Sequence, residues 1–321
     1  MKRILLTAFV FGLLLCLISG LHAQRVYPFI ELTDEDLARI DLHDGSVNDW
    51  IDVLGDPALT ALDFFPGSFS ESYDPADLDF RIWLAWHGAT NRLYVAMERA
   101  DDIYANDFDR DDIWRKIMST FDSGIDFFID GDKGRDSRAL QGSEDHGKAS
   151  WFLEIERKSQ WYAAIAEVHD EGPHIQFPNL PPAHPSQSRF VDLNPHGEWY
   201  LQPPYAEGGG GRFGERPTLS VTEFYVTAYD QFVWNDPQAS QVSELHVGKV
   251  IDFNIVVQDW EGEAVEPFDY NQEGFFLLSS DGRWVDGLLV GADGAIPQQE
   301  DTAVESVTWG RIKATFDKEI P

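Results

Sequence analysis

Hydrophobic and polar residues alternate one by one along much of this chain. The clearest stretches are Phe80–Trp86 and Leu93–Glu98, and the polar segment between them, His87–Arg92, has the length of a hairpin connection. A period of two sends successive side chains to opposite faces of a strand, whereas a helix repeats every 3.6 residues. The pattern therefore predicts a β-hairpin over these residues.

The same alternation, with Gly, Asp and Pro at the turns, recurs further along the chain. It predicts strands at Gly124–Asp130, Ser150–Glu156, Trp161–Val168, Ser220–Tyr229, Lys249–Gln258, Gly274–Ser279 and Val304–Phe316. Helical periodicity is scarce and predicts two short helices, Thr33–Ile40 with Thr33 as N-cap and Asp111–Thr120. The chain is therefore expected to be an all-β protein, an antiparallel β-sandwich or jelly roll with one or two short helices.

The region from Glu171 to Pro217 breaks this pattern. It is rich in proline and contains the run Gly208–Gly211. A long stretch of this composition between strands is typical of a functional or disordered loop. We predict a Pro/Gly-rich insertion at 171–217 within a single domain that spans residues 24–321.

The N-terminus has the order of a secretory signal peptide. Lys2 and Arg3 precede an apolar run of about 15 residues, Ile4–Ile18, which is shorter than the roughly 20 residues needed to cross a bilayer, and Ala23 offers a cleavage site. We predict that residues 1–23 are removed, that the product is exported to the periplasm or cell exterior, and that it has no membrane insertion afterwards. Cys16, the single cysteine, leaves with this segment, so no disulfide is expected.

The charge of the chain limits its partners. Its 56 Asp and Glu residues face 24 Lys and Arg residues, a formal net charge of −32. Nucleic acid and anionic membranes are repelled by such a field, because phosphate binding needs clustered cations. Divalent cations and neutral ligands are favoured instead.

Four segments together resemble a carbohydrate-binding module of family 9. Ile40–Trp50 resembles the opening of that family, in which an Asp-Gly turn precedes a tryptophan, and Asp79–Glu98 resembles its first hairpin. Asp122–Asp132 is similar to a strand with an acidic-aromatic-aliphatic-Asp pattern, and Trp309–Ile312 is similar to a closing strand. The resemblance implies a β-sandwich that binds a polysaccharide or oligosaccharide without catalysis.

Carbohydrate recognition uses flat aromatic faces stacked on sugar C–H groups, together with polar groups that bond the hydroxyls. The adjacent pair Trp199 and Tyr200, within the insertion, is the preferred candidate platform. Tryptophans in strands, such as Trp83 and Trp86, are expected in the core. Further ligand-binding candidates, in loop-like or strand-end positions, are Trp114, Trp234 and Trp260.

Two acidic turns are candidate calcium sites, because calcium takes six to eight hard oxygen ligands. One set of carboxylates is Asp130, Asp132 and Asp136, around a glycine that permits a tight turn; the other is Asp107, Asp109 and Asp111. Calcium would then be a structural cofactor. The alternative is that these are solvated acidic turns, neutralised locally by Arg110, Lys133 and Arg135.

The sequence holds no His-Glu-x-x-His or Gly-x-Ser-x-Gly motif, and no catalytic residue is assigned. We therefore predict a binding protein and not an enzyme. Two other functions stay open: an extracellular scaffold or protein-interaction domain that contacts an exported partner protein, and a polysaccharide hydrolase. A hydrolase would need two carboxyl groups roughly 5–10 Å apart in a cleft.

Overall fold

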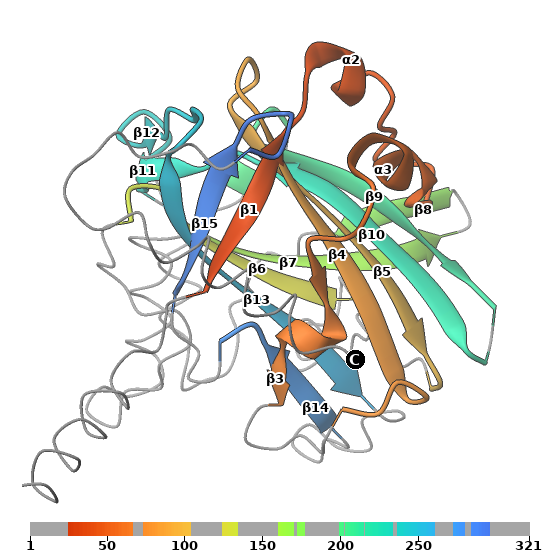
Figure 1. Ribbon diagram of the computed structural model, residues 1–321. Coiled ribbons are helices and arrows are strands. Elements are labelled where there is room, and N and C mark those ends of the chain that lie inside the picture. Colours follow the sequence, from red (N-terminus) through yellow and green to blue (C-terminus); the bar gives the residue numbers. More distant parts are fainter. Residues whose placement is uncertain are drawn as a thin grey trace, which may run out of the picture.

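The predicted hairpin is present and lies at the centre of the fold (Figure 1). Leu78–His87 (β4) and Arg92–Asp101 (β5) pair antiparallel along their whole length. In the first half of β4, buried and more exposed residues alternate, but every residue from Ile82 onward is buried. This part of the strand is therefore covered on both faces.

The structure is a computed structural model that describes residues 25–66, 73–103, 124–133, 160–169, 172–176, 199–201, 203–214, 216–233, 236–260, 272–279 and 284–295. Its helices are α2 (Asp34–Leu37) and α3 (Asn48–Leu54), with short 3-10 turns η1 (Ala61–Asp63) and η2 (Trp199–Leu201). The other strands are β1 (Val26–Glu31), β2 (Leu59–Thr60), β3 (Phe65–Pro66), β6 (Gly124–Asp130), β7 (Gln160–His169), β8 (Gly172–Gln176), β9 (Ala206–Phe213), β10 (Thr218–Val226), β11 (Tyr229–Gln231), β12 (Gln241–Val242), β13 (Val250–Trp260), β14 (Gln272–Leu277) and β15 (Val285–Val290).

Thirteen of the described strands belong to one sheet. Its main path is β8-β7-β6-β13-β15-β1-β4-β5-β10-β9, with β2, β3 and β14 attached beside it. The sheet curls until β7 and β8 contact β9, and no pairing among the described residues closes it into a ring. The result is a β-sandwich, with β1 and β15 joining its two halves (Figure 1). The predicted fold class is confirmed.

One strand departs from the antiparallel arrangement that we expected. β1 pairs in parallel with β15 on one side and with β4 on the other. The alternation of residues in β1 matches a strand of either direction, so the sequence pattern carries no information on this point.

Two hydrophobic cores lie on opposite faces of β4, β5 and β10. The inner core lies between the two halves of the sandwich and includes Trp86, Phe224 and Phe253. The outer core lies under α2 and α3 and includes Trp50 and Trp83 (Figure 1). The core positions predicted for Trp83 and Trp86 are therefore confirmed, since each is 1% exposed.

The predicted helix at Thr33 is confirmed, but it ends earlier, at Leu37. Thr33 is its N-cap: the Thr33 hydroxyl accepts a hydrogen bond from the Asp36 backbone N–H (3.1 Å), and Asp36 Oδ2 accepts one from the Thr33 backbone N–H (3.1 Å). The sequence did not predict α3. Its seven residues bury only Trp50, too little to give a helical repeat.

The segment Glu171–Pro217 is not irregular throughout, because β8 and β9 lie within it. Gly208–Gly211 forms the middle of β9 and pairs in register with β10. Glycine weakens a strand and gives no alternation, so the run was interpreted as a loop. Glycine within a strand often marks a place where another backbone approaches closely.

Several predictions concern residues outside the described ranges. These are the signal peptide 1–23, the second helix Asp111–Thr120, and the strands Ser150–Glu156 and Val304–Phe316. Within the described ranges, no helix is long and apolar enough to span a membrane.

Candidate functional site

The aromatic pair Trp199 and Tyr200 belongs to a larger group of rings. The Trp199 ring makes edge-to-face contacts with Tyr200 (centroids 5.6 Å apart), Tyr205 (5.0 Å) and Tyr229 (5.5 Å), and a tilted contact with Phe232 (6.0 Å). Such contacts stabilise a ring beyond simple burial. Trp199 is therefore held in a fixed position.

The two members of the predicted platform differ in burial. Tyr200 is 3% exposed and belongs to the inner core, where it also contacts Tyr162. Trp199 is half-buried and packs against the edge of that core. Of the pair, only Trp199 therefore has surface to offer to a ligand. Trp260 ends β13, and the candidates Trp114 and Trp234 lie outside the described residues.

The acidic turn after β6 is described only in part. Asp130 is buried at the end of the strand, and Asp132 is exposed. Lys133, beside Asp132, forms a salt bridge to Asp286 of β15 (2.8 Å). Asp136, Asp107, Asp109 and Asp111 lie outside the described residues, so calcium binding at both turns stays a prediction.

A buried ion network lies inside the sandwich. Arg99 of β5 is 0% exposed; its Nε donates to Asp101 Oδ2 (3.0 Å) and its Nη2 to Asp259 Oδ1 (3.2 Å). Its Nη1 donates to the backbone carbonyl of Gln258. Burial raises the pKa of Asp101, and the neighbouring guanidinium opposes this shift. The network thus neutralises buried carboxylates with a cation that belongs to the chain itself.

A second buried carboxylate lies on the outer face of the same sheet. Glu223 of β10 is 0% exposed, and its Oε1 accepts a hydrogen bond from Trp50 Nε1 (2.8 Å). Glu223 Oε2 is buried with no hydrogen-bond partner among the described residues. Burial raises the pKa of Glu223 to about 9; the negative charges of Asp49 and Asp44 add to this shift, and the Trp50 indole and the nearby Ser46 backbone N–H oppose it.

The loop that leads into α3 brings two more carboxylates to Glu223. Asp49 accepts hydrogen bonds from the backbone N–H groups of Asp41 (2.8 Å) and Trp50 (2.8 Å), and Asp44 accepts one from Ser46 (2.8 Å). One carboxylate oxygen from each of Asp44, Asp49 and Glu223 lies within 4.8 Å of the other two. We call these three residues the acidic triad.

The glycine run in β9 explains how the loop comes so close. Gly209 lies opposite Glu223 in the β9–β10 pairing, and a Cβ at Gly209 would lie only 2.3 Å from the Leu42 carbonyl oxygen. Gly45, with φ +67°, contacts Gly211 in the same way, since its Cβ would lie 3.2 Å from Gly211 Cα. The loop backbone therefore rests directly on the β9 backbone, which is possible only without side chains there.

Sequence reasoning missed the acidic triad. Asp44, Asp49 and Trp50 were noted only as part of a family resemblance, and Glu223 lies 173 residues beyond Trp50. Two signals were available: an acidic residue within the apolar strand pattern of β10, and a glycine run beside it. Only the fold shows that both signals lie next to the Asp-Gly turn.

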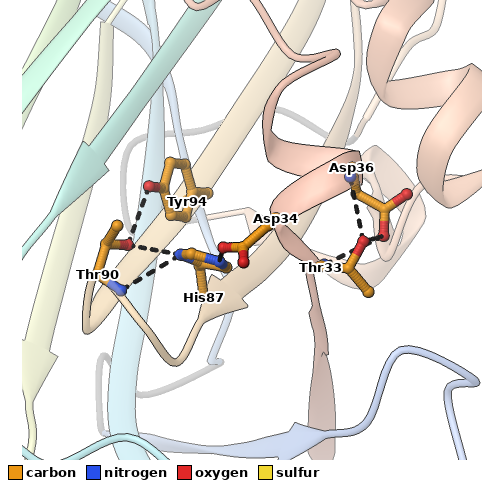
Figure 2. A network of polar contacts seen from close by, with 6 residues as sticks. All are labelled: Thr33, Asp34, Asp36, His87, Thr90 and Tyr94. Atoms are coloured by element: carbon orange, nitrogen blue, oxygen red, sulfur yellow. Dashed lines mark hydrogen bonds and ion pairs between the residues drawn. The ribbon is translucent and has the colours of Figure 1, made fainter.

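A separate polar network joins α2 to the central hairpin (Figure 2). The Thr90 backbone N–H donates to His87 Nδ1 (3.3 Å), which makes that nitrogen the acceptor. His87 Nε2 then carries the proton and donates to Asp34 Oδ1 (3.0 Å). The Thr90 hydroxyl links His87 to the Tyr94 hydroxyl (3.3 Å). The imidazole is 4% exposed and serves to hold α2 on the sheet.

No family model matches the chain, and no curated protein matches it. Among solved structures, it is similar to a family 9 carbohydrate-binding module from Caldicellulosiruptor kristjanssonii in complex with cellotriose: 11% identity, TM-score 0.41, covering 88% of this chain and 98% of that one. The same kind of module from that organism, in complex with glucose, is 8% identical, with TM-score 0.41 and coverage of 87% and 100%. A proposed carbohydrate-binding protein from Bacteroides uniformis is 10% identical, with TM-score 0.34 and coverage of 83% and 100%. The family that the sequence motifs resemble is also the family of the first two structures.

Proposed function

We propose that this protein is an exported, non-catalytic carbohydrate-binding protein of the periplasm or cell exterior. The glycan would stack on Trp199, and neighbouring polar groups would bond its hydroxyls. Structural calcium at the acidic turns 130–136 and 107–112 belongs to the same proposal.

The observation that carries the proposal is the environment of Trp199. Its ring is half-buried, so part of it faces solvent, while Tyr200, Tyr205 and Tyr229 fix it edge-on. A large aromatic residue that is already immobile loses little conformational entropy when a ligand stacks on it.

The experiment is a calorimetric titration with soluble oligosaccharides. Glucose and cellotriose come first, followed by xylan and mannan fragments. We expect one class to bind, and we expect W199A to lose that binding while F65A, which removes a partly exposed ring on β3, retains it. Circular dichroism shows whether W199A is still folded, and W199F serves as the milder variant.

Two results would reject the proposal. The first is that no oligosaccharide binds, in the presence or absence of calcium; co-purification with an exported partner would then favour the protein-interaction function. The second is hydrolysis of a bound oligosaccharide, seen as a change in product length, which would favour the hydrolase.

A further inference from the structure

The acidic triad has an unbalanced charge. Among the described residues, no Lys or Arg forms a salt bridge to Asp44, Asp49 or Glu223. The contact between His43 of this loop and Glu207 of β9 (3.5 Å) does not include them. Three carboxylates so close together repel each other, and burial makes the repulsion stronger.

The unpartnered oxygen of Glu223 is the second, independent observation. Glu223 Oε2 is fully buried, and a buried polar atom without a partner costs about 1–3 kcal/mol. The other oxygen, Oε1, is fixed by Trp50 Nε1, so the carboxylate plane is already oriented. A group that binds to the triad would supply the partner that Oε2 lacks.

We propose that Asp44, Asp49 and Glu223 bind a hard divalent cation, of the calcium type, which fastens the loop of residues 41–49 to β10. Each carboxylate brings one oxygen to the cluster, and calcium takes six to eight oxygen ligands in all. Asp44 is exposed, so water reaches the site from its side and completes the coordination.

The surrounding hydrogen bonds have the arrangement of an outer coordination shell. Backbone N–H groups of Asp41 and Trp50 hold the Asp49 carboxylate, and that of Ser46 holds Asp44. Groups of this kind orient carboxylate ligands before the ion arrives. The glycines of β9 bring the loop close enough for all three carboxylates to reach one point.

Two other uses of the triad fit less well. A proton on Glu223 removes one negative charge but leaves Asp44 and Asp49 facing each other. A pair of catalytic carboxyl groups would have to reach a substrate, and Glu223 is 0% exposed beneath the loop. A small cation entering beside Asp44 meets neither difficulty.

The test is a calorimetric titration of the purified, EDTA-treated protein with Ca²⁺, and separately with Mg²⁺. E223Q keeps the size of the side chain and an acceptor for Trp50, and D44N keeps the acceptor for Ser46. We expect each variant to bind one cation fewer than the unchanged protein, or to bind that cation at least about tenfold more weakly, since each removes a charged ligand. The same variants should lose the rise in unfolding temperature that the cation gives the unchanged protein.

D293N is the matched control. Asp293 also accepts a hydrogen bond from the backbone N–H two residues on (3.0 Å) and precedes a glycine of positive φ (+66°), yet it lies outside the triad. It should bind the cation as the unchanged protein does. D132N changes the acidic turn after β6 and leaves the triad intact, so the cation bound at the triad should remain in this variant.

Three results would overturn the proposal. These are no binding of either cation to the unchanged protein, as many bound cations in folded D44N as in the unchanged protein, or a cation that is lost in D132N while E223Q loses none. If E223Q does not fold, D44N decides, because Asp44 is exposed and its substitution leaves the outer core intact.

Discussion

Buried carboxylates lie on both faces of the sheet formed by β4, β5 and β10, but their partners differ between the two faces. On the inner face, Asp101 and Asp259 share the guanidinium of Arg99, and all three are almost fully buried. On the outer face, Glu223 lies with Asp44 and Asp49 and receives only hydrogen bonds. One cluster contains its own cation, and the other does not.

The difference follows from access. On the inner face, the side chains of Arg99, Asp101 and Asp259 are at most 3% exposed, and the positive charge there is part of the chain. The outer cluster lies beneath a loop whose Asp44 is exposed. A cluster in that position can take its counter-charge from solution. Buried carboxylates on one sheet can therefore be neutralised in two ways: by a cation of the chain or by a cation from the solvent.

The largest effect is expected from R99M, which tests whether the inner cluster depends on its own cation. The substitution removes the inner cation and leaves Asp101 and Asp259 buried without it. Removing one partner of a buried ion pair costs about 3–5 kcal/mol, so we expect a loss of that size in the free energy of unfolding. Urea denaturation followed by tryptophan fluorescence measures it.

R81M is the control for this change. Arg81 also bridges a carboxylate, Glu98 (2.8 Å), but its side chain is 42% exposed. Exposed pairs contribute about 0–1 kcal/mol, so R81M should be nearly neutral. Equal losses in the two variants would contradict the distinction between a sealed cluster and a surface pair.

The second prediction concerns the approach of the loop to β9. In G209A the new methyl group would lie 2.3 Å from the Leu42 carbonyl oxygen, so the loop has to move away from Glu223. Overpacking of this kind costs about 1–3 kcal/mol, and urea denaturation should show a loss in that range. G291A, where the nearest atom would lie at 3.4 Å, should change stability far less. Tolerance of G209A would show that the close contact is dispensable.

The third prediction uses the pKa of Glu223, raised from 4.5 to about 9 by burial and by Asp49 and Asp44. In metal-free protein the folded state holds this proton more tightly than the unfolded state. The stability it gives is complete below the unfolded pKa and is lost as the pH rises toward 9. The slope reaches at most about 1.4 kcal/mol per pH unit for one proton.

Urea denaturation in EDTA across this pH range measures that slope. E223Q has no proton to lose at this position, so its stability should depend less on pH than that of the unchanged protein. Asp49, whose pKa burial also raises, contributes in the same direction and remains in the variant. Identical slopes in the two proteins would show that Glu223 does not titrate in this range.

The sequence predicted strands well where hydrophobic and polar residue types alternate. The hairpin of β4 and β5, the strand β6 and the capped turn of α2 were found because period-two alternation and Thr33 with Asp36 are local signals. The four-glycine strand was mistaken for a loop, since glycine carries no pattern. The parallel direction of β1 could not be foreseen, because a strand of either direction shows the same alternation.

The candidate sites divide in the same way. Trp199 could be proposed as a ligand platform, because it lies outside the predicted strands. Its partners Tyr205, Tyr229 and Phe232 could not be identified without the fold. The acidic triad joins a loop to a strand 173 residues further on, and it depends on which face Glu223 occupies. Such a site arises from topology, which local patterns do not encode.

The position of β1 between β15 and β4 has a consequence for folding. The first strand of the described chain pairs with the last, so Val26 meets Asp286 across some 260 residues. Pairings of such high contact order form slowly, because much of the chain has to be ordered before they close. Until β15 arrives, β1 and β13 both present unpaired edges, which are sites of aggregation. A newly made chain thus has to be extended as far as β15 before its two halves can be joined.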